Sequence, residues 1–202
     1  MDGAATASVS LDGKALAWLH RGNDGVFGVW ISSPPGAEPK PYQPAPFASR
    51  AYVNVPTVKF SPDGRQILML RNGDNRREEA WLMPYPANAA TPPHRILQGL
   101  PAFGGTPTFS WMPDNRHVVV STTPGSAPQQ LYMADTVSGA FRVISSGTTN
   151  QVAPAVSPDG SKLVFVEAVS DFDVVSVDLA TAAVTPLITT QRSEYLPAWA
   201  SR

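Results

Sequence analysis

The chain has 202 residues, a formal net charge of −1 at pH 7, 21 prolines, 15 glycines and no cysteine. The balanced charge does not predict a nucleic-acid partner, because binding to nucleic acid requires a basic surface. No apolar run approaches the ~18 residues of a membrane-spanning helix, and a chain without cysteine forms no disulfide and has no thiol for catalysis.

A phrase of four residues returns four times along the chain. Its copies are Ser10-Leu11-Asp12-Gly13, Ser61-Pro62-Asp63-Gly64, Met112-Pro113-Asp114-Asn115 and Ser157-Pro158-Asp159-Gly160. The aspartates follow one another at intervals of 51, 51 and 45 residues. Self-similarity at this period is typical of stacked β-units.

The first copy predicts four strands. Residues 6–9 precede the phrase, and residues 16–18 follow it with apolar side chains four and six positions after the aspartate. Side chains alternate along a strand, so these two lie on one face. The phrase itself predicts a type I turn, since Ser, Pro and Gly suit its first, second and fourth positions and Asp bonds locally to the backbone. Residues 29–31 and a weaker segment at 41–42 complete the unit.

The later copies repeat this order. Further strands are expected at 58–60, 67–69, 80–82, 95–97, 118–120, 131–133, 142–144, 163–165, 174–176 and 186–188. The second strand of every copy is apolar at three successive positions, which predicts that both of its faces are buried between stacked sheets. A large apolar residue also precedes each aspartate by three positions, and we expect two of these, Phe60 and Trp111, to be buried between neighbouring sheets.

Four short strands in about 45 residues make one blade of a β-propeller. We therefore expect an all-β chain with a single propeller domain over 1–202 and blades at about 6–46, 55–98, 106–146 and 153–190. Leu196-Pro197-Ala198-Trp199 matches Ala153-Pro154-Ala155-Val156. Residues 194–202 thus open a fifth blade or supply a closing strand. We favour a segment of a longer propeller, whose exposed blade edges allow self-association.

The extended phrase resembles the TolB-type, WD40-like repeat of bacterial β-propellers. Residues 56–69, 107–120 and 154–165 carry its pattern, Pro-x-(Trp/Phe)-Ser-Pro-Asp-Gly-x-x-(Leu/Ile)-x-Phe, with variations, and residues 9–18 carry a reduced form. The resemblance implies a periplasmic or otherwise extracytoplasmic module that binds a protein or peptide through its rim loops or channel. Met1–Ala5 lack the layout of a signal peptide.

A second function is also compatible with the resemblance. Similar repeats occur beside the catalytic domains of prolyl-oligopeptidase-type peptidases and in sensor regions of bacterial Ser/Thr kinases. The alternative to a binding or scaffold module is therefore an accessory propeller of a larger enzyme or sensor, with catalysis outside this chain.

The sequence contains no recognisable catalytic or metal-binding constellation. His20, His94 and His117 lie far apart and lack metal-ligand spacing. No Gly-x-Ser-x-Gly motif indicates a serine hydrolase. We interpret each aspartate of the repeated phrase as the cap of its own turn, and we expect a non-catalytic chain that needs no metal or cofactor.

The densest cluster of charge lies at 71–79 and is the candidate partner-binding loop. Its charged members are Arg71, Asp74, Arg76, Arg77, Glu78 and Glu79. Loops at the rim of a propeller often carry binding, so this cluster is where a partner-binding site is first expected. The competing interpretation is a solvated loop in which opposite charges offset each other.

Overall fold

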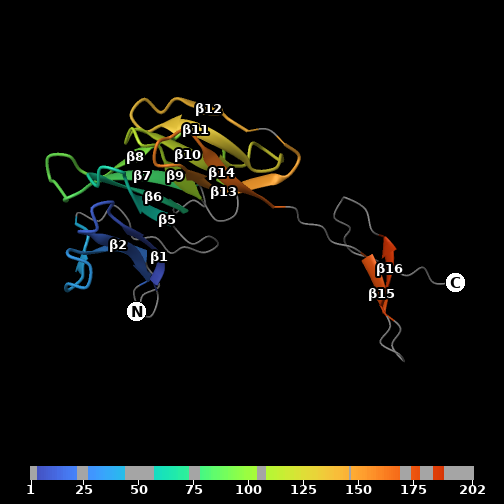
Figure 1. Ribbon diagram of the computed structural model, residues 1–202, viewed down its shortest axis with the longest axis horizontal. Helices are drawn as coiled ribbons and strands as arrows, with labels where there is room; N and C mark the ends of the chain where they lie inside the picture. Colours follow the sequence, from blue (N-terminus) through green and yellow to red (C-terminus); the bar gives the residue numbers. More distant parts are fainter. Residues whose placement is uncertain are drawn as a thin grey trace. The chain divides into compact units, whose positions relative to one another are not determined.

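The computed structural model of the chain describes residues 4–21, 27–43, 57–72, 78–103, 108–145, 147–168, 174–177 and 184–188 (Figure 1). These residues form β-strands joined by turns and contain no helix that could cross a membrane. The chain divides into two compact units, Met1–Glu167 and Ala168–Arg202.

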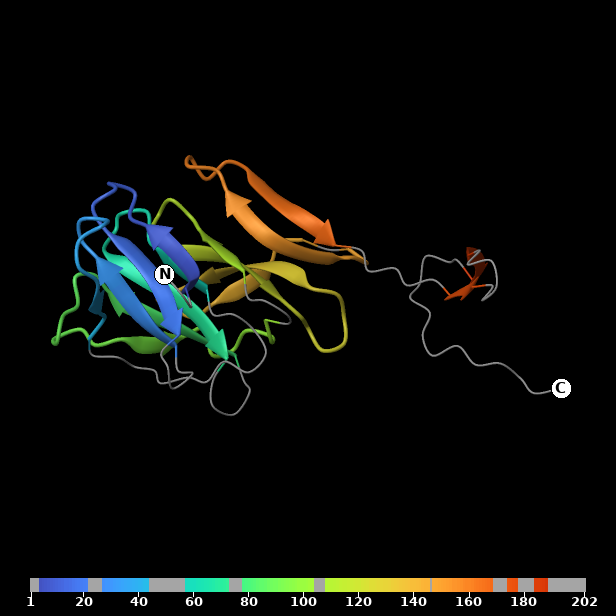
Figure 2. The ribbon, with the colours of Figure 1, turned by 90° about the horizontal axis from the view of Figure 1, so that it is seen from below.

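The first unit contains three four-stranded antiparallel sheets, each built from strands that are consecutive in the chain. The first sheet comprises β1 (Ala4–Val9), β2 (Leu16–Arg21), β3 (Phe27–Ser32) and β4 (Lys40–Pro41). The second comprises β5 (Thr57–Phe60), β6 (Gln66–Asn72), β7 (Glu78–Pro84) and β8 (His94–Ile96). The third comprises β9 (Phe109–Trp111), β10 (His117–Thr122), β11 (Gln130–Asp135) and β12 (Phe141–Val143). Figure 2 shows these sheets following one another in chain order.

The fourth copy of the repeat also forms strands where they were predicted. β13 (Asn150–Val156) pairs with β14 (Leu163–Ala168), and in the second unit β15 (Val174–Val177) pairs with β16 (Val184–Ile188). That these four strands make one blade within a single domain over 1–202 stays a prediction. The segment at 194–202, expected to open a fifth blade or to close the ring, lies outside the described residues.

The repeated phrase forms the predicted turn in all four copies. In the second copy, the N–H of Gly64 donates to the carbonyl of Ser61 at 2.9 Å, and Asp63 accepts the hydroxyl of Ser61 at 2.7 Å and the N–H of Arg65 at 3.0 Å. The fourth residue of each copy has a positive φ, in Gly13 (71°), Gly64 (70°), Asn115 (60°) and Gly160 (72°). Glycine and asparagine adopt this left-handed conformation at least cost, which explains why only they occupy the position.

The core lies between neighbouring sheets. Phe60, only 6% exposed, packs in a cluster that joins residues of the first and second sheets, such as Leu19 and Met69. Trp111, 7% exposed, packs in a cluster that joins the second and third sheets, beside Leu68. The predicted burial of both aromatic residues between sheets is confirmed.

The second strands of the first two sheets, β2 and β6, each contact the following sheet through one face. Leu68 and Leu70 on β6, five and seven positions after their aspartate, are fully buried against the third sheet. The equivalent residues of β14, Val164 and Val166, are 66% and 52% exposed, and Phe165 between them is exposed too. The predicted burial of both faces is therefore wrong for β14, because no further sheet of the described first unit packs on it.

Candidate functional site

The first strands of successive sheets are linked by serine side chains at one position of the repeat, four residues before the aspartate. The N–H of Phe60 on β5 donates to Oγ of Ser8 on β1 at 3.1 Å. The N–H of Val156 on β13 donates to Oγ of Ser110 on β9, also at 3.1 Å. These bonds place the ends of the first strands, and the turns that follow them, next to one another.

Lys59 occupies the same repeat position in the second copy. Its Nζ donates to the carbonyl of Phe109 on β9 at 2.5 Å and lies 5.4 Å from the centroid of the Phe109 ring. Burial disfavours the charged ammonium and lowers the pKa of Lys59. The lysine therefore joins the second and third sheets as the serines join their neighbours.

The four repeated phrases converge on one pocket of about 270 Å³, which we call the turn pocket. Each copy contributes the apolar residue three positions before its aspartate, together with residues of the phrase itself. The lining residues are Val9, Leu11, Phe60, Ser61, Pro62, Trp111, Pro113, Val156, Ser157 and Pro158. Phe60 and Trp111 are buried, whereas Val9 is exposed and Leu11 is 82% exposed. The pocket thus offers apolar surface that solvent reaches.

The aspartates of the phrases cap their own turns. Asp12 accepts the hydroxyl of Ser10 at 2.7 Å and the N–H of Lys14 at 3.1 Å, and these hydrogen bonds lower its pKa. In the fourth copy the hydroxyl of Ser157 donates to Asp159 at 2.6 Å, and with the N–H and hydroxyl of Ser161 it lowers the pKa of Asp159 to about 2.

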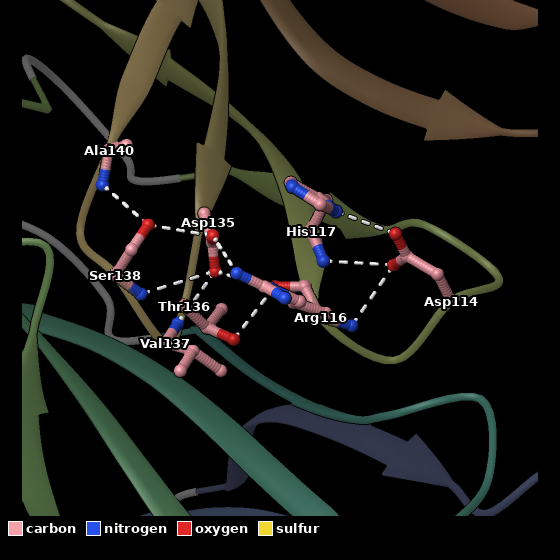
Figure 3. Close-up of polar contacts among 8 residues, drawn as sticks. All are labelled: Asp114, Arg116, His117, Asp135, Thr136, Val137, Ser138 and Ala140. Carbon is pink, nitrogen blue, oxygen red and sulfur yellow. Dashed lines mark hydrogen bonds and ion pairs between the residues drawn. The ribbon is translucent and has the colours of Figure 1, made fainter.

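The third copy has a histidine beside its aspartate (Figure 3). Asp114 accepts the N–H groups of Arg116 and His117 at 3.0 and 2.9 Å, and Nδ1 of His117 lies 2.6 Å from its Oδ2. Burial alone would raise the pKa of Asp114, but these hydrogen bonds outweigh it and the pKa is lowered. Together the four copies confirm the interpretation of the aspartates as turn caps. Among the described residues, no three His, Cys, Asp or Glu side chains are grouped to hold a metal ion.

A second carboxylate in Figure 3 closes the end of the β10–β11 pair. Asp135 accepts hydrogen bonds from Nε and Nη2 of Arg116 at 2.9 and 2.6 Å. It also accepts one from the hydroxyl of Ser138 at 2.7 Å. These bonds hold the pKa of Asp135 far below its usual range. The serine and His117 are bonded to different carboxylates, so this cluster orders two turns and does not form a serine–histidine nucleophile.

Two of the six predicted partner-binding residues are buried in an ion-pair cluster. Arg71, at the end of β6, reaches Oε2 of Glu79 on β7 with Nε at 2.9 Å and Nη2 at 2.8 Å. Trp81 donates its indole N–H to the same oxygen at 2.9 Å, and Nη2 of Arg95 lies 3.1 Å from Oε1. Burial alone would raise the pKa of Glu79, but these donors and charges outweigh it and lower the pKa.

For the remaining four predicted residues, the structure describes no contact with this cluster. Asp74, Arg76 and Arg77 lie outside the described residues, and Glu78 is described only through its backbone in β7. The described ends of the segment thus pair as parts of β6 and β7 and bury the charges of Arg71 and Glu79, and its recognition of a partner stays a prediction. The sequence did not point to Trp81, which lies two residues after Glu79 on β7, or to Arg95, which becomes a neighbour of Glu79 only through the pairing of β7 with β8.

No model of a known protein family matches the chain, and no curated protein sequence matches it. Solved structures are similar in fold. TolB from Acinetobacter baumannii matches 94% of this chain and 44% of its own, with a TM-score of 0.64 and 18% identity. Putative TolB from Agrobacterium tumefaciens matches 93% of this chain and 62% of its own, with the same score and identity. A puromycin-hydrolyzing peptidase from Mycobacterium tuberculosis matches 96% of this chain and 30% of its own, with a TM-score of 0.58 and 14% identity.

The chain therefore spans less than two thirds of the length of either TolB structure. At these identities the similarity concerns the fold and does not transfer an activity. It agrees with the consecutive four-stranded antiparallel sheets and with the turns of the repeated phrase. The predicted recognition is confirmed at this level: the chain has a TolB-type β-propeller fold.

Proposed function

We propose that the chain is a non-catalytic β-propeller module that binds a protein or peptide, and that the turn pocket is its contact site. The observation that carries the proposal is the convergence of all four repeated phrases on one apolar pocket with exposed residues at Val9 and Leu11. Exposed apolar surface gathered in one place is typical of an interaction site.

The size and chemistry of the turn pocket suit side chains of a partner. Its volume of about 270 Å³ lies just below the range for small-molecule sites, roughly 300–1,000 Å³. Proline rings from three phrases and the indole of Trp111 supply rigid apolar surface. Aromatic side chains in well-packed pockets dominate the energy of protein interfaces. One or two apolar side chains of a peptide are therefore the expected occupants.

The second candidate function is an accessory propeller of a larger enzyme. It is supported by the structural similarity to the peptidase from Mycobacterium tuberculosis, of which this chain covers 30%. In that case the reacting groups lie outside these residues, and the propeller holds or admits a peptide substrate. We further propose an extracytoplasmic location, which rests on the resemblance to the TolB-type repeat.

The turn pocket is tested with peptides selected from a random display library against the wild-type chain. Their affinities are then measured by calorimetry for the wild type, Leu11→Asp and Val137→Asp. Both replaced residues are strongly exposed, but only Leu11 lines the turn pocket. We expect apolar peptides whose binding weakens about tenfold or more in Leu11→Asp, equivalent to about 1.4 kcal/mol, and stays unchanged in Val137→Asp.

Two results would contradict the proposal. Equal affinity for the wild type and Leu11→Asp would show that the turn pocket is not the contact site. Failure to select any peptide with saturable binding would argue against peptide recognition by this module.

A further inference from the structure

A second pocket, of about 500 Å³, lies beside β7 and β8 and the segment that follows β8. We call it the outer-strand pocket, and it shares no lining residue with the turn pocket. Ile96, Leu97, Leu100 and Phe103 supply apolar wall, whereas Glu79 and Arg95 are its charged residues. The pocket is therefore apolar along one part and charged at another.

Among the residues that the structure describes, two positive side chains and one negative side chain meet beside this pocket. Two guanidinium groups, of Arg71 and Arg95, surround the single carboxylate of Glu79. Arg71 is buried and bonds Oε2 through two nitrogens, so it compensates the charge of Glu79. Arg95 adds a second positive charge, and its side chain is 45% exposed.

Arg95 uses only one of its nitrogens, Nη2, in its ion pair with Glu79. Its Nη2 contacts Oε1 of Glu79 at 3.1 Å, and in the described part of the chain no other carboxylate pairs with it. A guanidinium group presents five N–H donors in a planar fork that matches a carboxylate. A neighbouring pocket, which shares Arg95 and the three residues after it with the outer-strand pocket, is also lined by His94 and by no acidic residue. The guanidinium group of Arg95 thus lines both pockets, and solvent reaches it.

The wall of the outer-strand pocket has a defined backbone conformation. Leu97 is buried and has a φ of 56°, an unusual value for a residue with a branched side chain. The N–H of Leu100 donates to the carbonyl of Leu97 at 3.1 Å and closes the turn. A residue keeps such a conformation only where the packing around it holds it in place. The apolar wall therefore has a fixed shape.

We propose that the outer-strand pocket binds a carboxylate carried on an apolar residue or tail, with Arg95 as the residue that pairs with the carboxylate. The apolar wall formed by Ile96, Leu97 and Phe103 receives the tail. A single negative charge suits the site, because Arg95 offers one guanidinium group and Glu79 repels a second negative charge. The same chemistry occurs in a small carboxylic acid and at the C-terminus of a peptide.

The probes are N-acetylleucine, its neutral amide and the N-acetylated peptide Ala-Ala-Ala-Leu with a free carboxylate. Binding is measured by calorimetry and by the indole N–H resonance of Trp81, which senses the cluster because that N–H bonds Glu79. We expect the free acid to bind and the amide to bind at least about tenfold more weakly. Tighter binding of the peptide would identify a peptide terminus as the source, and equal or weaker binding would identify a free acid.

Arg95→Gln removes the charge, and Arg142→Gln is the matched control, because Arg142 is exposed on β12 and does not line the outer-strand pocket. We expect Arg95→Gln to weaken binding of N-acetylleucine about tenfold or more, Arg95→Lys to restore part of it, and Arg142→Gln to leave it unchanged. If Arg95→Gln does not fold, two other comparisons test the proposal. One is the affinity of Arg95→Lys against that of Arg142→Gln, and the other is the affinity of the wild type for the acid against that for the amide. Equal binding of acid and amide, full affinity in Arg95→Gln, or no saturable binding would overturn the proposal.

Discussion

At the scale of single residues, the glycines that end the repeated phrases differ in their surroundings. Gly64 and Gly160 have nearly the same positive φ, 70° and 72°. A Cβ atom at Gly160 would lie 3.1 Å from Cγ of Pro113 in the preceding copy, whereas at Gly64 the nearest atom would be Cβ of Ser10 at 3.8 Å. The fourth phrase thus packs more tightly on its neighbour than the second does.

We expect Gly160→Ala to reduce the free energy of unfolding by more than Gly64→Ala does. Each change incurs about 1–2 kcal/mol from the left-handed conformation, and Gly160→Ala adds the contact with Pro113. Urea denaturation measures the difference. The control is Gly28→Ala in β3, where the nearest atom lies at 3.7 Å and φ is not positive. Equal destabilisation by Gly160→Ala and Gly28→Ala would contradict this account.

At the scale of the element, the turn is stabilised by an ionised carboxylate. Asp12, Asp114 and Asp159 all have lowered pKa values, and hydrogen bonds from the groups of their own turns lower them. A carboxyl whose pKa is lower in the folded than in the unfolded chain contributes stability above the unfolded value. That contribution is lost as the pH falls through the folded value.

The free energy of unfolding should therefore fall as the pH drops from about 4 to about 2, the window between the ordinary pKa of an aspartate and that of Asp159. Asp159→Asn should make this fall shallower, because the variant has no carboxyl to titrate at that turn. Urea unfolding at a series of pH values provides the measurement. Glu38→Gln, at an exposed residue outside the repeated phrases, is the control. An unchanged slope in Asp159→Asn would show that the turn carboxylate does not stabilise the fold.

At the scale of the whole molecule, equivalent positions of the repeat have opposite exposure. Leu68 and Val164 both stand five residues after their aspartates, yet Leu68 is fully buried between two sheets and Val164 is 66% exposed. On β6 the same apolar face is covered by the next sheet. The exposed face of β14 is therefore suited to pack against another sheet. The exposed face of β14 is the place at which we expect one copy of the chain to associate with another.

We expect Leu68→Ala to cost about 2–5 kcal/mol of unfolding free energy and Val164→Ala much less, since only the first leaves a cavity in the core.

Val164→Lys should reduce the concentration-dependent association of the chain, measured by light scattering. Val137→Lys is the control, because Val137 is exposed and lies on the turn that joins β11 and β12. A wild-type chain that stays monomeric at every concentration would disprove the association.

The sequence predicted those features that depend on residues near one another in the chain. Strand alternation, the chemistry of the phrase and the period of the repeat placed the strands and the turns, and the regular position of Phe60 and Trp111 indicated their burial. The candidate loop was less predictable. Charge density alone could not show that Arg71 and Glu79 face each other across a strand pair and are buried.

The all-β architecture, the repeating unit and the role of the turn aspartates could be predicted from residues close together in the chain, because each follows from local backbone geometry repeated four times. Three features could be seen only in the folded chain: the four phrases meet in one pocket, Arg95 joins the cluster around Glu79, and Val164 stays exposed. The physical reason is that these features arise from the stacking of sheets and from cross-strand neighbours. Residues roughly 16 to 150 positions apart in the chain form them, at distances over which local pattern carries no information.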